Sequence, residues 1–93
     1  MYIIRSFKYI ASLQKIMNYI SKDSKNRALE FRNKLENQIN NIILMPYKCR
    51  KSIYFKDENI RDLIHKGYTI VYKVDEKADT IIIIGIKKYT NSL

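Results

Sequence analysis

The sequence predicts an α+β fold, in which a short N-terminal strand and an antiparallel helical hairpin pack on a twisted antiparallel sheet of three to four C-terminal strands. The prediction depends on a change of period: apolar residues recur every three or four positions before Pro46 and at alternate positions after it. Helices followed by a run of strands are typical of an antiparallel sheet with its helices on one face. The length of 93 residues corresponds to a single domain, residues 1–93.

The beginning of the chain predicts one strand and one helix. Tyr2–Arg5 is a short run of β-prone residues and is expected to form the first strand. Ser6 can cap a helix over about Phe7–Ser21. The apolar residues of this helix recur with its period and should form one buried stripe: Ile10, Leu13, Ile16, Met17 and Ile20.

A second, longer helix follows after a break of a few residues. Asp23 or Ser24 can cap it, and Pro46 should end it near Met45, because the proline ring cannot continue a helix. Two amphipathic helices joined by so short a break should form an antiparallel hairpin. The buried stripe of the second helix is expected to contain Ala28, Phe31, Leu35, Ile39 and Ile42.

Beyond Pro46 the pattern predicts strands separated by turns. Ser52–Phe55 is a short β-prone run, and Ile60–Ile64 alternates after an Asp-Glu-Asn turn. Tyr68–Val74 follows a glycine and presents one apolar face. Thr80–Ile86 is nearly all isoleucine, which indicates a strand that lies inside the sheet and is apolar on both faces.

The charge is large and unevenly distributed. The net charge is +9. All of this excess lies in residues 1–56, because acidic and basic residues balance in residues 57–93. Such a charge suggests a polyanionic partner such as nucleic acid, the ribosome or an acidic protein. The alternative is an ordinary solvated lysine-rich surface in a protein from an AT-rich genome.

Cysteine content and hydropathy exclude several classes of protein. The single cysteine, Cys49, cannot form an internal disulfide, and no His/Cys cluster suggests a metal site or a cofactor. The N-terminus lacks the pattern of a signal peptide. The longest apolar run, Ile81–Ile84, is far shorter than the ~20 residues of a membrane helix. We therefore expect a cytoplasmic protein with no membrane association and no small-molecule ligand.

The order of these motifs resembles the RelE/ParE superfamily of bacterial toxins over nearly the whole chain. The most specific part is Arg61-x-Leu63 followed by Gly67-Tyr68-x-Ile-Val-Tyr72, at the spacing of that superfamily. The amphipathic helix before Pro46, a basic residue after a short loop (Arg50) and a basic end (Lys87-Lys88) complete the pattern. The resemblance implies the toxin of a type II toxin–antitoxin module, held inactive by a cognate antitoxin.

The resemblance implies one of two targets. The RelE-like branch cleaves mRNA on the ribosome, and the ParE-like branch blocks DNA gyrase. RelE-type ribonucleases usually carry a basic residue where this chain has Thr69, and lysines where it has Ile60 and Asp62. The C-terminal histidine that other ribonuclease members use is also lacking. These departures favour a ParE-like gyrase inhibitor over the alternative, a ribosome-dependent mRNA endonuclease.

The basic residues that the family pattern singles out are the candidate site. Seven residues are expected to contact the target: Lys48, Arg50, Lys51, Arg61, Lys87, Lys88 and Tyr89. If the chain is a ribonuclease, its acid–base cluster would be drawn from Arg50, Lys51, Arg61, Lys88 and Tyr89. Two alternatives stay open: Arg61 could instead form a salt bridge to Asp62 or Asp79, and the basic loop could simply be solvated.

Other polar and aromatic residues favour structural roles. His65 has no acidic partner at motif spacing, so a surface or strand-pairing role is favoured over catalysis. For Tyr68 and Tyr72, packing against the helices is favoured over base stacking. An antitoxin is expected to cover the helical hairpin or to add a strand at an open edge, where Tyr2–Arg5 and Ser52–Phe55 are the candidates.

Overall fold

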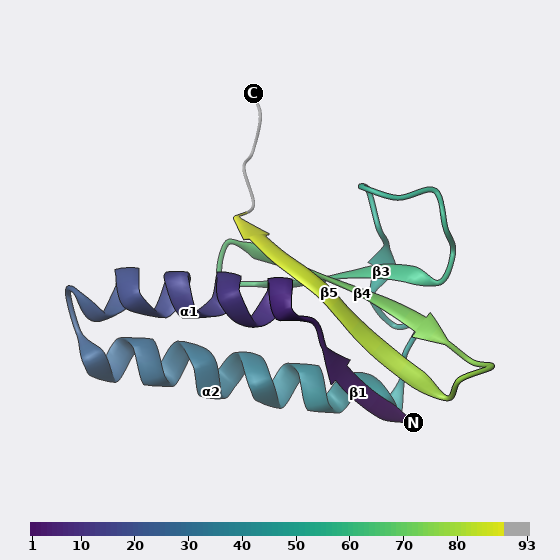
Figure 1. Ribbon diagram of the computed structural model, residues 1–93, viewed down its shortest axis with the longest axis horizontal. Helices are drawn as coiled ribbons and strands as arrows, with labels where there is room; N and C mark the ends of the chain where they lie inside the picture. The colour runs from purple at the N-terminus through teal and green to yellow at the C-terminus, as the bar shows by residue number, and fades with distance from the viewer. Residues whose placement is uncertain (89–93) are drawn as a thin grey trace.

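The protein has two layers, a helical hairpin and a five-stranded sheet, in the computed structural model, which describes residues 1–88 (Figure 1). The elements, in chain order, are β1 (Tyr2–Arg5), α1 (Phe7–Ser21), α2 (Lys25–Asn41), a 3₁₀ turn η1 (Ile42–Leu44), β2 (Arg50–Lys51), β3 (Ile60–His65), β4 (Tyr68–Asp75) and β5 (Thr80–Lys88). This order confirms the predicted α+β fold.

The sheet is mixed, with the strand order β1-β5-β4-β3-β2. The C-terminal strands pair antiparallel, as predicted, whereas β1 pairs parallel with β5. Strand β5 lies between β1 and β4 and is therefore inside the sheet, which confirms the interpretation of its isoleucine run. The two edges of the sheet are β1 and the two-residue β2.

Serine side chains begin both helices. Ser6 Oγ accepts a hydrogen bond from Tyr9 N (3.1 Å) and donates one to Ile84 O on β5 (2.7 Å). Ser24 Oγ accepts from Arg27 N (3.2 Å), so Ser24 rather than Asp23 is the cap of α2. The α-helix ends at Asn41, and the last turn before Pro46 tightens into η1.

The prediction of a strand at Ser52–Phe55 is wrong, because β2 ends at Lys51. Ser52 N still donates to Ile60 O (2.9 Å), but Ile53 N donates to the carboxylate of Asp62 (3.1 Å). The next amide, Tyr54 N, donates to Ser52 Oγ (3.2 Å). Side-chain oxygens therefore accept the amide hydrogen bonds of Ile53 and Tyr54 in place of a neighbouring strand, and the chain leaves the sheet.

The core lies between the hairpin and one face of the sheet. Tyr72 is fully buried there, and Tyr68 packs edge-on against Phe31 (centroids 5.5 Å apart), which confirms that both tyrosines face the helices. The buried residues that the two layers contribute are Tyr9, Phe31, Leu35, Ile39, Ile42, Ile70, Tyr72, Val74, Ile81, Ile83 and Ile86.

One position in the predicted stripe of α1 is wrong. Ile10 is exposed, and Tyr9 is buried in its place. The Tyr9 hydroxyl donates to Glu36 on α2 (3.1 Å), which also forms an ion pair with Arg5 on β1 (3.0 Å). Burial, followed by the Glu36 charge, raises the pKa of Tyr9. Polar contacts of Glu36 with Tyr9 and Arg5 thus connect β1, α1 and α2. Tyr9 can be buried there because its hydroxyl donates to Glu36.

Candidate functional site

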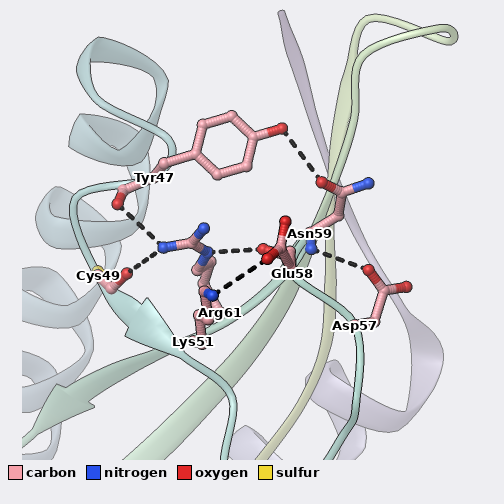
Figure 2. Close-up of polar contacts among 7 residues, drawn as sticks. All are labelled: Tyr47, Cys49, Lys51, Asp57, Glu58, Asn59 and Arg61. Carbon is pink, nitrogen blue, oxygen red and sulfur yellow. Dashed lines mark hydrogen bonds and ion pairs between the residues drawn. The ribbon is translucent and has the colours of Figure 1, made fainter.

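Arg61 on β3 lies at the centre of the polar contacts that hold the segment between η1 and β3 (Figure 2). Its Nε donates to Glu58 O (2.8 Å), and its Nη1 donates to Tyr47 O (3.2 Å) and Cys49 O (3.1 Å). The guanidinium also lies 4.9 Å from the centre of the Tyr47 ring. Among the described residues it forms no ion pair with Asp62 or Asp79, so that part of the prediction is wrong.

The residues around Arg61 are themselves connected. The Tyr47 hydroxyl lies 3.5 Å from Asn59 Oδ1, and Asn59 N donates to Asp57 Oδ1 (2.8 Å) (Figure 2). The same hydroxyl also lies 3.1 Å from Glu76 Oε1 in the β4–β5 turn. Partial desolvation and the hydrogen bond to Glu76 raise the pKa of Tyr47. The Arg61 guanidinium therefore holds the segment 47–59 against the sheet.

Two of the three cations in the Lys48–Lys51 run, Arg50 and Lys51, have acidic neighbours. Lys51 Nζ lies 3.2 Å from Glu58, in a pair that is exposed on both sides. Arg50 Nη2 lies 3.4 Å from Asp62, whose carboxylate is completely buried. Lys48 is the one cation of the Lys48–Lys51 run that forms no ion pair with a described residue. The Lys48–Lys51 run is thus partly neutralised.

Asp62 holds the segment 52–55 against the sheet face that points away from the helices. Besides the contact with Arg50, its Oδ2 accepts from Ile53 N (3.1 Å), whereas its Oδ1 has no partner among the described residues. Thr69, a buried residue on the same face of the neighbouring strand, also has an unpartnered hydroxyl. Thr69 pairs across the sheet with Lys87, whose ammonium lies 4.2 Å above the Tyr54 ring. The segment therefore extends over this face from β3 to β5.

The end of β5 gathers a second group of cations beside α1. Lys87 lines a hollow of about 230 Å³ with Lys8 and the aromatic rings of Tyr54 and Phe55. Lys87 and Lys88 line another, of about 380 Å³, with Lys15. None of these lysines forms an ion pair with a described residue. We call Lys8, Lys15, Lys87 and Lys88 the β5 basic group.

The predicted residues thus fall into two separate places. Arg50, Lys51 and Arg61 lie at the β2–β3 edge, and Lys51 is the sheet partner of Arg61. Lys88 pairs instead with Tyr68, at the hairpin end of β4 and two strands away from β3. Tyr89 lies outside the described residues. The structure does not bring the proposed acid–base set together.

Sequence reasoning missed Lys8 and Lys15 as neighbours of the C-terminal lysines. They are seven positions apart on one helix, a spacing that places them on the same face, so a signal was available. It also missed Tyr54 and Phe55, which were assigned to a strand. Nothing in their local sequence indicates that they leave the sheet to cover its outer face.

The remaining candidate residues, His65 and Cys49, are packed among other side chains of the fold. His65 pairs with Tyr68 across β3 and β4, which confirms the strand-pairing alternative, and it is buried, so the surface alternative is wrong. Its ring lies 5.0 Å from that of Phe31. Burial, followed by the charge of Lys66, lowers the pKa of His65. Cys49 is half-buried beside Tyr72, whose hydroxyl donates to Pro46 O (2.7 Å). Burial and the contact with Cys49 raise the pKa of Tyr72.

Residues 1–88 contain no group of three or more His, Cys, Asp and Glu side chains that could hold a metal ion. Over the same residues, no helix is both long and apolar enough to cross a membrane.

Comparison with known proteins gives one family and two similar structures. A sequence model for the ParE toxin of the type II toxin-antitoxin system, parDE, matches residues 3–90. A chain from the chromosomal ParDE system of P. aeruginosa has a TM-score of 0.77 at 16% identity, with 97% of each chain covered. The isolated E. coli RelE toxin has a TM-score of 0.69 at 14% identity, with 98% of this chain and 86% of that one covered. No curated protein matches the sequence.

Proposed function

This chain belongs to the ParE toxin family of type II toxin–antitoxin systems, and from that membership we propose that it arrests growth by binding DNA gyrase in the cytoplasm. Membership in the family also implies a cognate antitoxin as partner. The toxin acts as a rigid binding protein rather than as an enzyme. Its target is a protein assembly that works on DNA, so a basic contact surface favours the encounter.

The observation that carries this proposal is the burial of Ile60, Asp62 and Thr69. RelE-type ribonucleases usually carry cations at these three positions, and cleavage of RNA needs cations around the phosphate. Here all three side chains are buried. Asp62 also anchors the segment 52–55, because its carboxylate accepts from Ile53 N. At these three positions the chain therefore exposes no cation or polar atom that could bind a phosphate.

The geometry of the remaining cations supports the same proposal. General acid–base catalysis needs the acid and the base within hydrogen-bond reach of one substrate. Arg61 is committed to three backbone carbonyls, and Lys88 lies two strands away. The β5 basic group, in contrast, forms no ion pairs among residues 1–88 and is spread along α1 and the end of β5. We assign gyrase contact to this group.

Charge reversal at one end of β5 tests the assignment. We expect Lys87→Glu combined with Lys88→Glu to raise the toxin concentration that half-inhibits gyrase supercoiling by about tenfold or more, because each close charge pair at an interface contributes on the order of 1.5 kcal/mol or more. The control matched in charge is Lys22→Glu combined with Lys77→Glu, two exposed lysines outside the β5 basic group. Equal inhibition by the double variant and the control would rule out the β5 basic group as the contact.

A further inference from the structure

Two neighbouring hollows open along the β5 basic group, and aromatic rings line both of them beside the lysines. The first hollow, of about 230 Å³, is lined by Tyr54 and Phe55, and the second, of about 380 Å³, by Tyr19 and Tyr68. Lys87 lines both hollows, so the two are adjacent. We call the two hollows together the β5 track.

The helix α1 sets the spacing of two lysines along the track. Lys8 and Lys15 are seven positions apart, which corresponds to roughly 10 Å along the helix axis. The side chain of Lys8 lies across the backbone of Gly85 on β5, because a Cβ atom at Gly85 would be 3.9 Å from Lys8 Cδ and Cε. Lys8 thereby reaches the first hollow, and Lys15 lines the second. Since charges repeat about every 3.4 Å along one stacked nucleic-acid strand, this spacing spans about three phosphates.

The positive charge of the track is not balanced by any acidic residue that the structure describes. No described carboxylate lines either hollow, and the lysines of the β5 basic group form no ion pairs among residues 1–88. The Lys48–Lys51 run differs, because two of its three cations have acidic neighbours. An anionic partner is therefore favoured at the track over the Lys48–Lys51 run.

The aromatic rings indicate which kind of anion fits the track. Tyr19 is 69% exposed, Phe55 is 47% exposed and Tyr54 is 38% exposed, so a ligand can reach all three rings. The ammonium of Lys87 lies 4.2 Å from the centre of the Tyr54 ring, which places a cation and an aromatic face side by side. Bases that stack on aromatic rings and phosphates that contact lysines are typical of single-stranded nucleic acid on its binding proteins. A duplex fits less well, because its bases are stacked inside it and would leave the rings unused.

We propose that the β5 track binds a single strand of DNA, with bases against Tyr19, Tyr54 and Phe55 and phosphates against the four lysines of the β5 basic group. The choice of DNA rests on the proposed function, because gyrase works on DNA and a toxin bound to gyrase meets that substrate. The track would then contact the DNA component of the gyrase–DNA complex. Charge reversal at Lys87 and Lys88 would weaken gyrase inhibition through the loss of this contact.

The salt dependence of DNA binding tests the lysines without gyrase. The probe is a fluorescein-labelled oligo(dT) of about twelve nucleotides, titrated with full-length toxin and followed by fluorescence anisotropy. If each of the four lysines neutralises one phosphate, the logarithm of the association constant should fall against the logarithm of the salt concentration with a slope of about −2.8. Lys8→Gln combined with Lys15→Gln should reduce this slope to about −1.4. The control with the same change in net charge is Lys22→Gln combined with Lys77→Gln, two exposed lysines outside the track, and it should keep the wild-type slope. Equal slopes for the two double variants would assign the binding to net charge alone and overturn the proposal.

A ring substitution tests base stacking. Tyr19→Leu removes one ring at an exposed helical position and should raise the Kd for oligo(dT) about fivefold or more, which is equivalent to about 1 kcal/mol. The same variant should bind a DNA duplex of equal length as tightly as the wild type does. The matched control is Tyr2→Leu, an exposed tyrosine on β1 outside the track. The proposal is wrong if Tyr19→Leu and Tyr2→Leu bind oligo(dT) equally well.

The remaining outcomes separate this proposal from the gyrase proposal. Wild-type toxin that shows these variant effects on DNA but leaves supercoiling intact would overturn the gyrase proposal and support the DNA-binding track. Gyrase inhibition that is lost in the Lys87→Glu and Lys88→Glu double variant, with no binding of oligo(dT) by the wild type, would overturn the DNA proposal and leave the gyrase polypeptide as the contact. An RNA strand of the same length that binds more tightly than oligo(dT) would overturn the assignment to DNA.

Discussion

Replacing Arg61 with alanine should destabilise the fold substantially, because its guanidinium donates to three backbone carbonyls of two separate segments. The acceptors are the carbonyls of Tyr47, Cys49 and Glu58, at 2.8–3.2 Å. A hydrogen bond made by a charged group contributes about 1.5–3 kcal/mol, but Arg61 is only half-buried, so we take about 1 kcal/mol for each. The stacking on Tyr47 contributes about 0.5–1 kcal/mol at such a site.

The expected loss for Arg61→Ala is therefore about 3.5–4 kcal/mol in the free energy of unfolding. In a domain of this size each 1 kcal/mol lowers Tm by about 4–8 °C, so Tm should fall by at least ~10 °C. Arg61→Lys keeps the charge, but its ammonium cannot reach the three carbonyls as the planar guanidinium does, so it should lose about 2 kcal/mol.

The assay is urea unfolding followed by far-UV circular dichroism, with Lys77→Ala as the control for removal of an exposed cation. If Arg61 were instead a free contact for the target, its removal would change the unfolding free energy by no more than about 0.5 kcal/mol. That result would refute the interpretation of Arg61 as the residue that closes the segment 47–59.

Three further predictions concern buried polar groups. Asp62→Ala should lower stability by about 1–3 kcal/mol and speed hydrogen exchange at Ile53 N, because the carboxylate is the acceptor of that amide. Since the folded state lowers the pKa of His65 below its ordinary 6.5, the unfolded chain binds the proton more readily, and stability should fall as the pH drops through 6.5 towards the folded pKa. His65→Gln, measured by urea unfolding at about pH 8 and about pH 5, should weaken that dependence; an unchanged dependence would assign it to other groups. Tyr72→Phe should lose about 1 kcal/mol in the same assay, because its hydroxyl no longer binds Pro46 O; an unaltered unfolding midpoint would count against this.

Features that depend on local sequence could be predicted. Ser6 and Ser24 cap their helices, and Pro46 lies just beyond η1, because capping and proline geometry act over a few residues. The isoleucine run of β5 correctly indicated an interior strand. The parallel pairing of β1 with β5 joins residues nearly eighty positions apart, and no local pattern specifies it.

The candidate site was less predictable than the fold, because the hydrogen-bond acceptors around Arg61 are backbone carbonyls and not side chains. Arg61 was considered for a salt bridge, but its partners are carbonyl oxygens, which every residue carries and no sequence pattern marks. The end of β2 depends on the carboxylate of Asp62, nine residues beyond the amide of Ile53 that it accepts from. The spacing of Lys8 and Lys15 on α1 was visible in the sequence, whereas their approach to Lys87 and Lys88 required the packing of α1 on β5.

We propose that this toxin acts by binding gyrase rather than by cutting RNA. The most direct measurement adds the purified wild-type toxin to a gyrase supercoiling assay and, in parallel, to programmed ribosomes with mRNA. A toxin that binds gyrase and does not cut RNA should abolish supercoiling and leave the mRNA intact. Cleaved mRNA with normal supercoiling would contradict the gyrase proposal, and would mean that the segment 52–55 moves away from Asp62 when the toxin meets the ribosome.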